Sequence, residues 1–354
     1  MPLLRSLVIS VCHRLGLFTY LRDAWRRDLA REQDRLNALQ RIVHALVAAG
    51  KDEASKAAEA ATRLETLFQR LRASEREMRA LRATIAVDQR QRGAWDRLDA
   101  TLATGTIARH IARAVDAAAL DLVPMPHFVV RDLWPADTYA ALLDAIPSDD
   151  FFPDKDPIKQ NMKIRQIHVA PTWTRRALEC LEDTIIPTIL TPALVARMQP
   201  HLDTVYLDEY GPSLGPLVAA LPHAATAGRL MLRRPGYTLQ PHLDPQRVAL
   251  TCLLYFARPG DNVKYGTQLF SIDRPVKWIR TNTLYPEREG CECRLVKDVP
   301  FEPNTALVFL NRGGAHAAEI PASAPPDTRR FSYQFYVSPE PAALEKLIVD
   351  SLHA

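Results

Sequence analysis

The chain has 354 residues and a mass of 39.8 kDa, with 47% hydrophobic and 24% charged residues and a formal net charge of +4. These ordinary values exclude a largely disordered chain, and no apolar stretch approaches the roughly 18 uncharged residues of a membrane-spanning helix. The five cysteines are too few for a disulfide framework, and an odd number cannot all pair with one another. A reducing cytoplasm is therefore the simplest compartment.

Residues 1–20 begin with an apolar stretch that His13 and Arg14 interrupt. No small-residue cleavage site follows, so we interpret this stretch as part of a cytoplasmic protein rather than a signal peptide. It predicts an amphipathic helix. Such a helix could pack on its own protein or lie on a membrane surface, which would make the protein membrane-peripheral.

Residues 21–115 are rich in alanine, arginine and leucine and contain no proline. The first 123 residues carry 21 Lys/Arg and 15 Asp/Glu, a net of +6, whereas the rest carry 24 and 26, a net of −2. Apolar residues recur at heptad spacing, for example at Leu29, Leu36 and Val43, and again at Leu64, Leu71, Met78 and Ile85. The pattern predicts either a helical hairpin that turns near Gly50 or a coiled coil that joins chains into a homo-oligomer. The arginines are most simply interpreted as a solvated face, with a nucleic-acid or lipid-phosphate surface as the alternative. Because no nucleic-acid motif accompanies them, nucleic acid is not expected as a partner.

Residues 124–340 have the composition of a separate domain, because 26 of the 27 prolines lie at or after Pro124. A strand is expected to end at Val130, followed by a helix that opens at 132–137 and runs to about residue 146. A second helix is expected over 174–199, broken by Pro187 and Pro192. Short apolar runs then alternate with turn residues, at 229–233, 248–256, 267–270, 293–296, 306–310 and 331–337. This spacing predicts an α+β domain with a jelly-roll-like core, also called a double-stranded β-helix. Residues 341–354 are expected to form a C-terminal helix.

Three residues of the strand region have the chemistry of a metal site. His242 and Asp244 are two apart, so in an extended chain both side chains point to one face. His316 follows a second apolar strand and a Gly-Gly turn, with 71 residues between it and Asp244. Two histidines and one carboxylate form the facial triad that non-haem Fe(II) oxygenases use.

An arginine and a serine at the start of the last predicted strand could bind a carboxylate. Arg330 and Ser332 share one face of the predicted strand, where a guanidinium and a hydroxyl can hold a carboxylate. If the strand register slipped by one residue, Arg329 would take the place of Arg330.

The order His242-x-Asp244, His316, Arg330-x-Ser332 resembles the 2-oxoglutarate- and Fe(II)-dependent oxygenases, near their prolyl-hydroxylase-like branch. The resemblance covers roughly residues 124–340. It implies that His242, Asp244 and His316 hold Fe(II), and that Arg330 and Ser332 bind the distal carboxylate of 2-oxoglutarate. O2 would be the second co-substrate, and ascorbate could stimulate turnover. Tyr237, Thr251 and Tyr255 are further candidates for the co-substrate pocket, each equally compatible with packing.

The implied activity is hydroxylation of an undetermined substrate: a protein side chain, a saccharide or a small metabolite. The basic and aromatic stretch 149–167 is a candidate substrate loop, suited to an acidic or sugar-like ligand or a peptide. The pair Arg233-Arg234 could face an anionic substrate near the iron or form salt bridges at a strand end. The alternative from another class is a non-catalytic coiled-coil scaffold that carries an inactive jelly-roll binding module.

Overall fold

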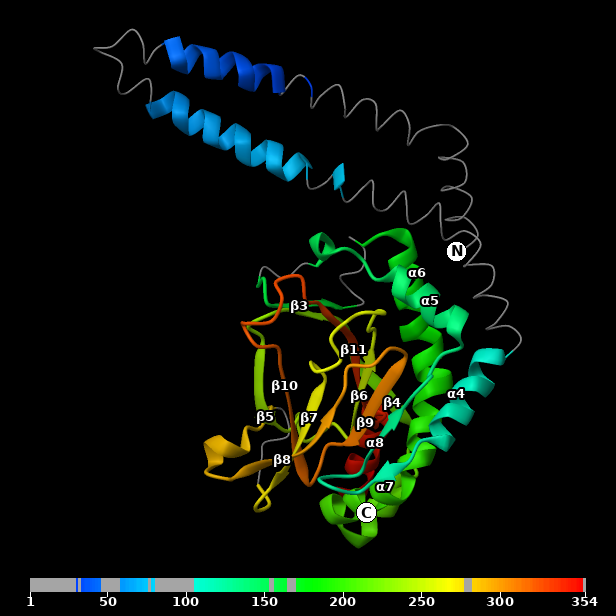
Figure 1. Cartoon of the computed structure of the whole chain (residues 1–354). Helices are drawn as coiled ribbons and strands as arrows, with labels where there is room; N and C mark the ends of the chain where they lie inside the picture. The colour runs from blue at the N-terminus through cyan, green and yellow to red at the C-terminus, as the bar shows by residue number, and fades with distance from the viewer. Residues whose placement is uncertain are drawn as a thin grey trace. The chain divides into compact units, whose positions relative to one another are not determined.

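The structure is a computed structural model, and it divides the chain into two units, Met1–Ala83 and Thr84–Ala354 (Figure 1). The residues that it describes are 30, 33–45, 58–75, 78–79, 105–152, 156–163, 170–276 and 282–352. None of the helices in these ranges is long and apolar enough to cross a membrane.

The described part of the first unit is helical over residues 33–45 and 58–75, as the heptad pattern predicts. Side-chain pairs four residues apart support the second stretch, including an ion pair of 2.6 Å between Arg63 and Glu59. Gly50 and the predicted amphipathic helix over 1–20 lie outside the described residues. Both the hairpin and the intermolecular coiled coil therefore remain predictions.

The second unit contains two antiparallel sheets. The larger has the order β1-β2-β9-β6-β11-β4-β3. Its strands in this order are Leu120–Asp121, His127–Val130, Thr305–Leu310, Leu250–Tyr255, Arg330–Pro339, His223–Arg233 and Lys159–Lys163. The smaller sheet has the order β5-β10-β7-β8. Its strands are Thr238–His242, Gly314–Glu319, Thr267–Ile272 and Cys293–Val299. The predicted α+β class with antiparallel sheets is confirmed.

The two sheets pack face to face, as a jelly roll requires. One buried cluster joins side chains of both sheets, among them Leu253 and Phe309 of the larger sheet and Leu269 and Val299 of the smaller. Strands β6 and β9 are buried along their whole length, and their side chains alternate between the two faces, so the opposite face of the larger sheet needs a second cover.

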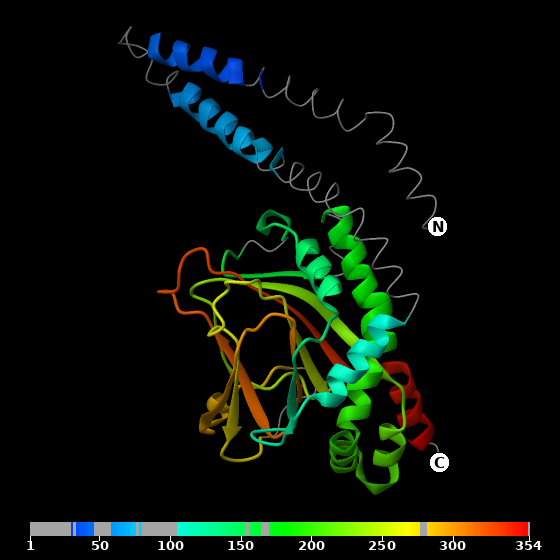
Figure 2. The same cartoon turned by 45° about the vertical axis from the view of Figure 1, so that its right-hand side comes forward.

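Helices provide this cover, as Figure 2 shows on the side of the larger sheet away from the smaller one. They are α4 (Thr106–Ala117), α5 (Ala136–Ala145), α6 (Thr172–Cys180), the π-helical η3 (Leu181–Leu190), α7 (Thr191–Ala219) and α8 (Pro341–Leu352). Two short 3-10 turns, η1 (Asp149–Phe151) and η4 (Pro286–Glu289), complete the elements. Ile107, Ile111 and Val115 of α4 are at most 1% exposed in the core beneath these helices, so α4 is an integral part of the second unit.

The prediction that prolines break the helix over 174–199 is wrong. Helical structure continues from α6 through η3 into α7. Pro187 lies inside the π-helical segment Leu181–Leu190. Pro192 is the second residue of α7, next to the junction with η3. The non-helical residue in α7 is Gly211, with φ 76°.

Candidate metal centre and co-substrate site

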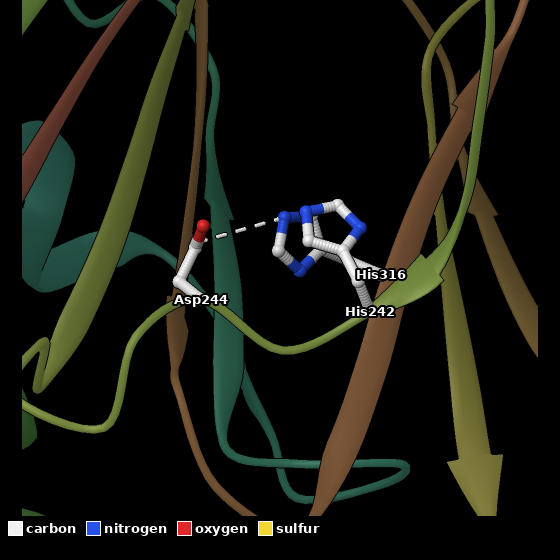
Figure 3. A group of neighbouring side chains, drawn as sticks. All are labelled: His242, Asp244 and His316. Atoms are coloured by element: carbon white, nitrogen blue, oxygen red, sulfur yellow. Dashed lines mark ion pairs between the residues drawn. The ribbon is translucent and has the colours of Figure 1, made fainter. Parts of the chain in front are cut away.

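The three candidate metal ligands come together between the sheets. His242 is the last residue of β5, and it lies directly opposite His316 of β10 in the ladder of the smaller sheet. Asp244 follows two residues after His242, and its carboxylate faces both imidazoles (Figure 3). One ligand atom from each of the three residues lies within 4.8 Å of the others. The ring centroids of the two histidines are 4.0 Å apart, and Asp244 Oδ2 is 3.6 Å from His316 Nε2.

This geometry fits a divalent ion. Neighbouring ligands on an octahedral ion at about 2.1 Å are about 3 Å apart, so the ligand atoms, which lie within 4.8 Å of one another, would need to approach by up to about 2 Å to complete the site. The Nδ1 of His242 lies 2.9 Å from the carbonyl oxygen of Gln240. A carbonyl only accepts, so Nδ1 carries the proton and Nε2 keeps a free lone pair for a metal.

The protonation states are also those of metal ligands. Burial, followed by the charge of His242, lowers the pKa of His316 to about 3. Burial likewise lowers the pKa of His242. Burial alone would raise the pKa of Asp244, but the two histidines and two hydrogen bonds lower it below its ordinary value. At neutral pH the site therefore offers two neutral imidazoles and one carboxylate, the forms that bind a metal.

Two hydroxyls orient the carboxylate. Thr251 of β6 donates to Asp244 Oδ2 at 2.6 Å, and Tyr336 of β11 donates to Oδ1 at 2.8 Å. Partners of this kind fix the orientation of a ligating group and tune its affinity for the ion. Thr251, a candidate for the co-substrate pocket, contacts a candidate metal ligand through this hydrogen bond. Tyr336 was missed, although its even spacing from Arg330 and Ser332 along one strand could have indicated it.

The turn that carries Asp244 is held by a second pair of residues. Asn311 accepts from the backbone N–H of Asp244 at 3.0 Å, and its amide group donates to the carbonyls of Asp244, Pro245 and Val248. Arg312 donates to the Val248 carbonyl at 3.1 Å and also pairs with Glu209 of α7. The sequence showed only that these two residues precede the Gly-Gly turn before His316.

Arg330 points between the sheets. It is 3% exposed, donates to the Thr267 hydroxyl at 3.0 Å, and lies over the rings of Tyr255 and Phe301 at 5.4 and 5.5 Å. Within the described ranges its Nε has no hydrogen-bond partner, nor has the Ser332 hydroxyl. A buried guanidinium with an unused N–H is costly, and a carboxylate ligand would satisfy both groups.

The neighbouring arginine takes a different position. Arg329 pairs through Nε with Asp149 at 2.8 Å, and its side chain is 37% exposed. Arg330 is therefore buried between the sheets, whereas Arg329 is partly exposed and forms an ion pair with Asp149.

The two remaining pocket candidates lie against different arginines, Tyr255 against Arg330 and Tyr237 against Arg233. Tyr255 donates to the Thr267 hydroxyl at 2.7 Å and is fully packed between the sheets. Tyr237 follows the turn after β4, with its ring 5.0 Å from the guanidinium of Arg233. Thr267 reaches this site because Gly266 has no side chain: a Cβ there would be 1.7 Å from the Val299 carbonyl oxygen.

Comparisons with known proteins give matches among solved structures only. No protein-family model matches the chain, and no curated protein matches it. SnoK, a non-haem α-ketoglutarate-dependent carbocyclase from nogalamycin biosynthesis, is 10% identical over 64% of this chain and 82% of its own, with a TM-score of 0.36. A Pseudomonas putida prolyl-4-hydroxylase is 13% identical over 66% and 99%, with a TM-score of 0.33. HygX from Streptomyces hygroscopicus, with nickel, 2-oxoglutarate and hygromycin B bound, is 13% identical over 60% and 82%, also with a TM-score of 0.33.

These matches belong to the class that the motifs resemble. Their identities and TM-scores are low, however, so the assignment rests on the strand topology and on the residues of the site itself.

Proposed function

We propose that the chain is a 2-oxoglutarate- and Fe(II)-dependent oxygenase that hydroxylates a primary substrate. The convergence of His242, Asp244 and His316 at one buried point between two antiparallel sheets carries this proposal. The unsatisfied Arg330 and Ser332 support it, because they offer a second, carboxylate-binding group in the same interior.

Each residue has a definite part in such an enzyme. The two imidazoles and the carboxylate would hold Fe(II) on one face and leave the opposite positions open to ligands. Thr251 and Tyr336 would keep the carboxylate oriented, and Arg330 with Ser332 would bind the distal carboxylate of 2-oxoglutarate. When bound, the iron and its co-substrate supply the oxidising chemistry. His242, Asp244 and His316 are at most 5% exposed, which would limit the access of water to the iron.

The test is succinate formation from 2-oxoglutarate with Fe(II) and ascorbate under air, in the wild type and in His316→Ala. The wild type should form succinate slowly even without the primary substrate, whereas His316→Ala should form none because the triad is incomplete. His201→Ala on α7 is the control histidine and should match the wild type. Circular dichroism should show that each variant is folded.

Absence of both succinate and Fe(II)-dependent 2-oxoglutarate binding in the wild type would refute the proposal. The non-catalytic scaffold would then be the better description of the chain.

A further inference from the structure

A row of three cationic side chains crosses the inner face of the larger sheet. Lys159 of β3 lies directly opposite Arg233 of β4, and Arg233 lies directly opposite Arg330 of β11. Side chains that are directly opposite in antiparallel strands share a face, and Arg330 faces the interior. Like charges in such positions repel one another, so the row favours an anion among them.

Arg233 is the buried centre of this row, and its hydrogen-bond partners among the residues that the structure describes are neutral. It is 3% exposed, donates to the Gln160 carbonyl at 2.7 Å and to Asn161 Oδ1 at 2.9 Å, and lies against the ring of Tyr237. None of the carboxylates in the described ranges forms an ion pair with it. A charge buried without a counter-charge destabilises the folded protein unless a ligand supplies one.

The nearest acidic groups do not fill this role. Asp156 carries a charge that acts on both Lys159 and Arg233, but it is fully exposed and accepts from the backbone N–H groups of Ile158 and Lys159. Asp149 pairs with Arg234 at 2.7 Å. The sequence left open whether this arginine pair forms salt bridges or faces an anionic substrate. Arg234 forms the salt bridge, whereas Arg233 is buried.

Bound Fe(II) and 2-oxoglutarate would not balance the positive charges of Arg233 and Lys159. The two positive charges of Fe(II) match the two negative charges of 2-oxoglutarate, and Arg330 matches Asp244. Arg233 and Lys159 are still without a counter-ion, and Arg229 adds a third cation on the same face of β4. Arg229 itself hydrogen bonds to the neutral side chains of Gln334 and Tyr336. Its Nε has no partner among the residues that the structure describes.

We infer that Arg233 and Lys159 bind a carboxylate or phosphate group of the primary substrate, separately from the co-substrate. This inference rests on the proposed function and narrows its substrate to an acidic molecule. Lys159 is exposed, so it can meet a substrate from solution, whereas Arg233 provides the buried end of the site. A planar guanidinium beside an ammonium is well suited to either anion.

The test uses inorganic phosphate as the probe and the full chain loaded with Mn(II) and saturated with 2-oxoglutarate. Calorimetric titration at low ionic strength should show saturable phosphate binding to the wild type. Arg233→Gln should weaken it about tenfold or more, and Lys159→Gln severalfold. The matched control is Arg234→Gln, which removes the adjacent cation from its salt bridge and should leave phosphate binding within about twofold.

Two results would overturn the inference. Equal phosphate affinity in the wild type, Arg233→Gln and Lys159→Gln would show that the row is not an anion site, as would no saturable binding to the wild type. Mutual displacement of phosphate and 2-oxoglutarate, with Arg233→Gln losing as much 2-oxoglutarate affinity as Arg330→Gln, would assign Arg233 to the co-substrate. The exposed Lys159 variant keeps the test valid if Arg233→Gln fails to fold.

The same titrations separate this inference from the proposed function. A wild type that binds no 2-oxoglutarate with Mn(II) present contradicts the proposed function. A wild type that binds 2-oxoglutarate but not phosphate contradicts only the anion site.

Discussion

Replacement of Arg330 by glutamine tests the co-substrate site, and replacement of its neighbour Arg329 is the matched control. The two residues are adjacent and chemically identical, but they lie in different surroundings. Arg330 is 3% exposed with an unused Nε. Arg329 has a partly exposed side chain paired with Asp149. Any difference between the two variants therefore reports position and not residue type.

The expected loss follows from the burial of Arg330. Truncation of one partner of a buried, hydrogen-bonded charge pair costs about 2–5 kcal/mol. At about 1.4 kcal/mol per tenfold, the affinity for 2-oxoglutarate should fall roughly 30-fold to several thousand-fold in Arg330→Gln. In Arg329→Gln the lost ion pair is worth at most about 1 kcal/mol of stability. Asp149 also keeps Arg234 as a partner, so 2-oxoglutarate affinity should stay within about twofold.

The assay is calorimetric titration of 2-oxoglutarate into each Mn(II)-loaded variant, with Mn(II) affinity measured in parallel. Mn(II) affinity should be unchanged in both variants, because neither arginine is a candidate ligand. Unchanged 2-oxoglutarate affinity in Arg330→Gln, or equal losses in the two variants, would refute the reasoning from burial and strand face.

Three further changes test other parts of the molecule. Asn311→Ala should weaken Mn(II) binding about 10- to 100-fold, measured by titration, because the turn that carries Asp244 loses its side-chain hydrogen bonds; unchanged affinity would contradict this. Burial raises the pKa of Glu182 from 4.5 to about 7. The folded protein therefore binds this proton more tightly than the unfolded chain does, and the free energy of unfolding falls as pH rises from the pKa of the unfolded chain through 7. A shift of this size is worth at most about 3 kcal/mol, and partial exposure reduces the expected gain in Glu182→Gln at pH 8 to about 1–2 kcal/mol. Urea unfolding should show this gain at pH 8 and not at pH 4, and an equal effect at both would count against it. Deletion of residues 1–83 should leave the second unit folded. If the heptads join chains, the deletion should also reduce the number of chains per particle, calculated from the mass measured by light scattering. A further deletion through α4 should unfold the second unit, because three core side chains are lost.

The pairs of site residues that share a face could be predicted from the sequence, because the local geometry of an extended chain determines which side chains point the same way. His242 and Asp244 share a face in any extended segment, and Arg330 and Ser332 do so on β11. The strand boundaries followed from turn residues between apolar runs, and they agree with β4, β6, β7, β8, β9 and β11 within a few residues, except that β4 begins six residues earlier.

The helix over 174–199 shows the limit of local rules. Prolines disfavour a regular α-helix, but the chain stays helical through the π-helical η3 at Pro187 and into α7 at Pro192. Packing of these helices on the sheet supplies the free energy that local propensity lacks.

The sequence by itself determined the donor set, its order along the chain and the alternation that separates inner from outer side chains. Only the tertiary structure decided which groups meet. It brings His316 opposite His242 across 73 intervening residues, adds Tyr336 and Asn311 around Asp244, and directs Arg233 inward. Contacts between distant segments depend on strand register and on the packing of two sheets, and a single residue of slip would reverse every side chain.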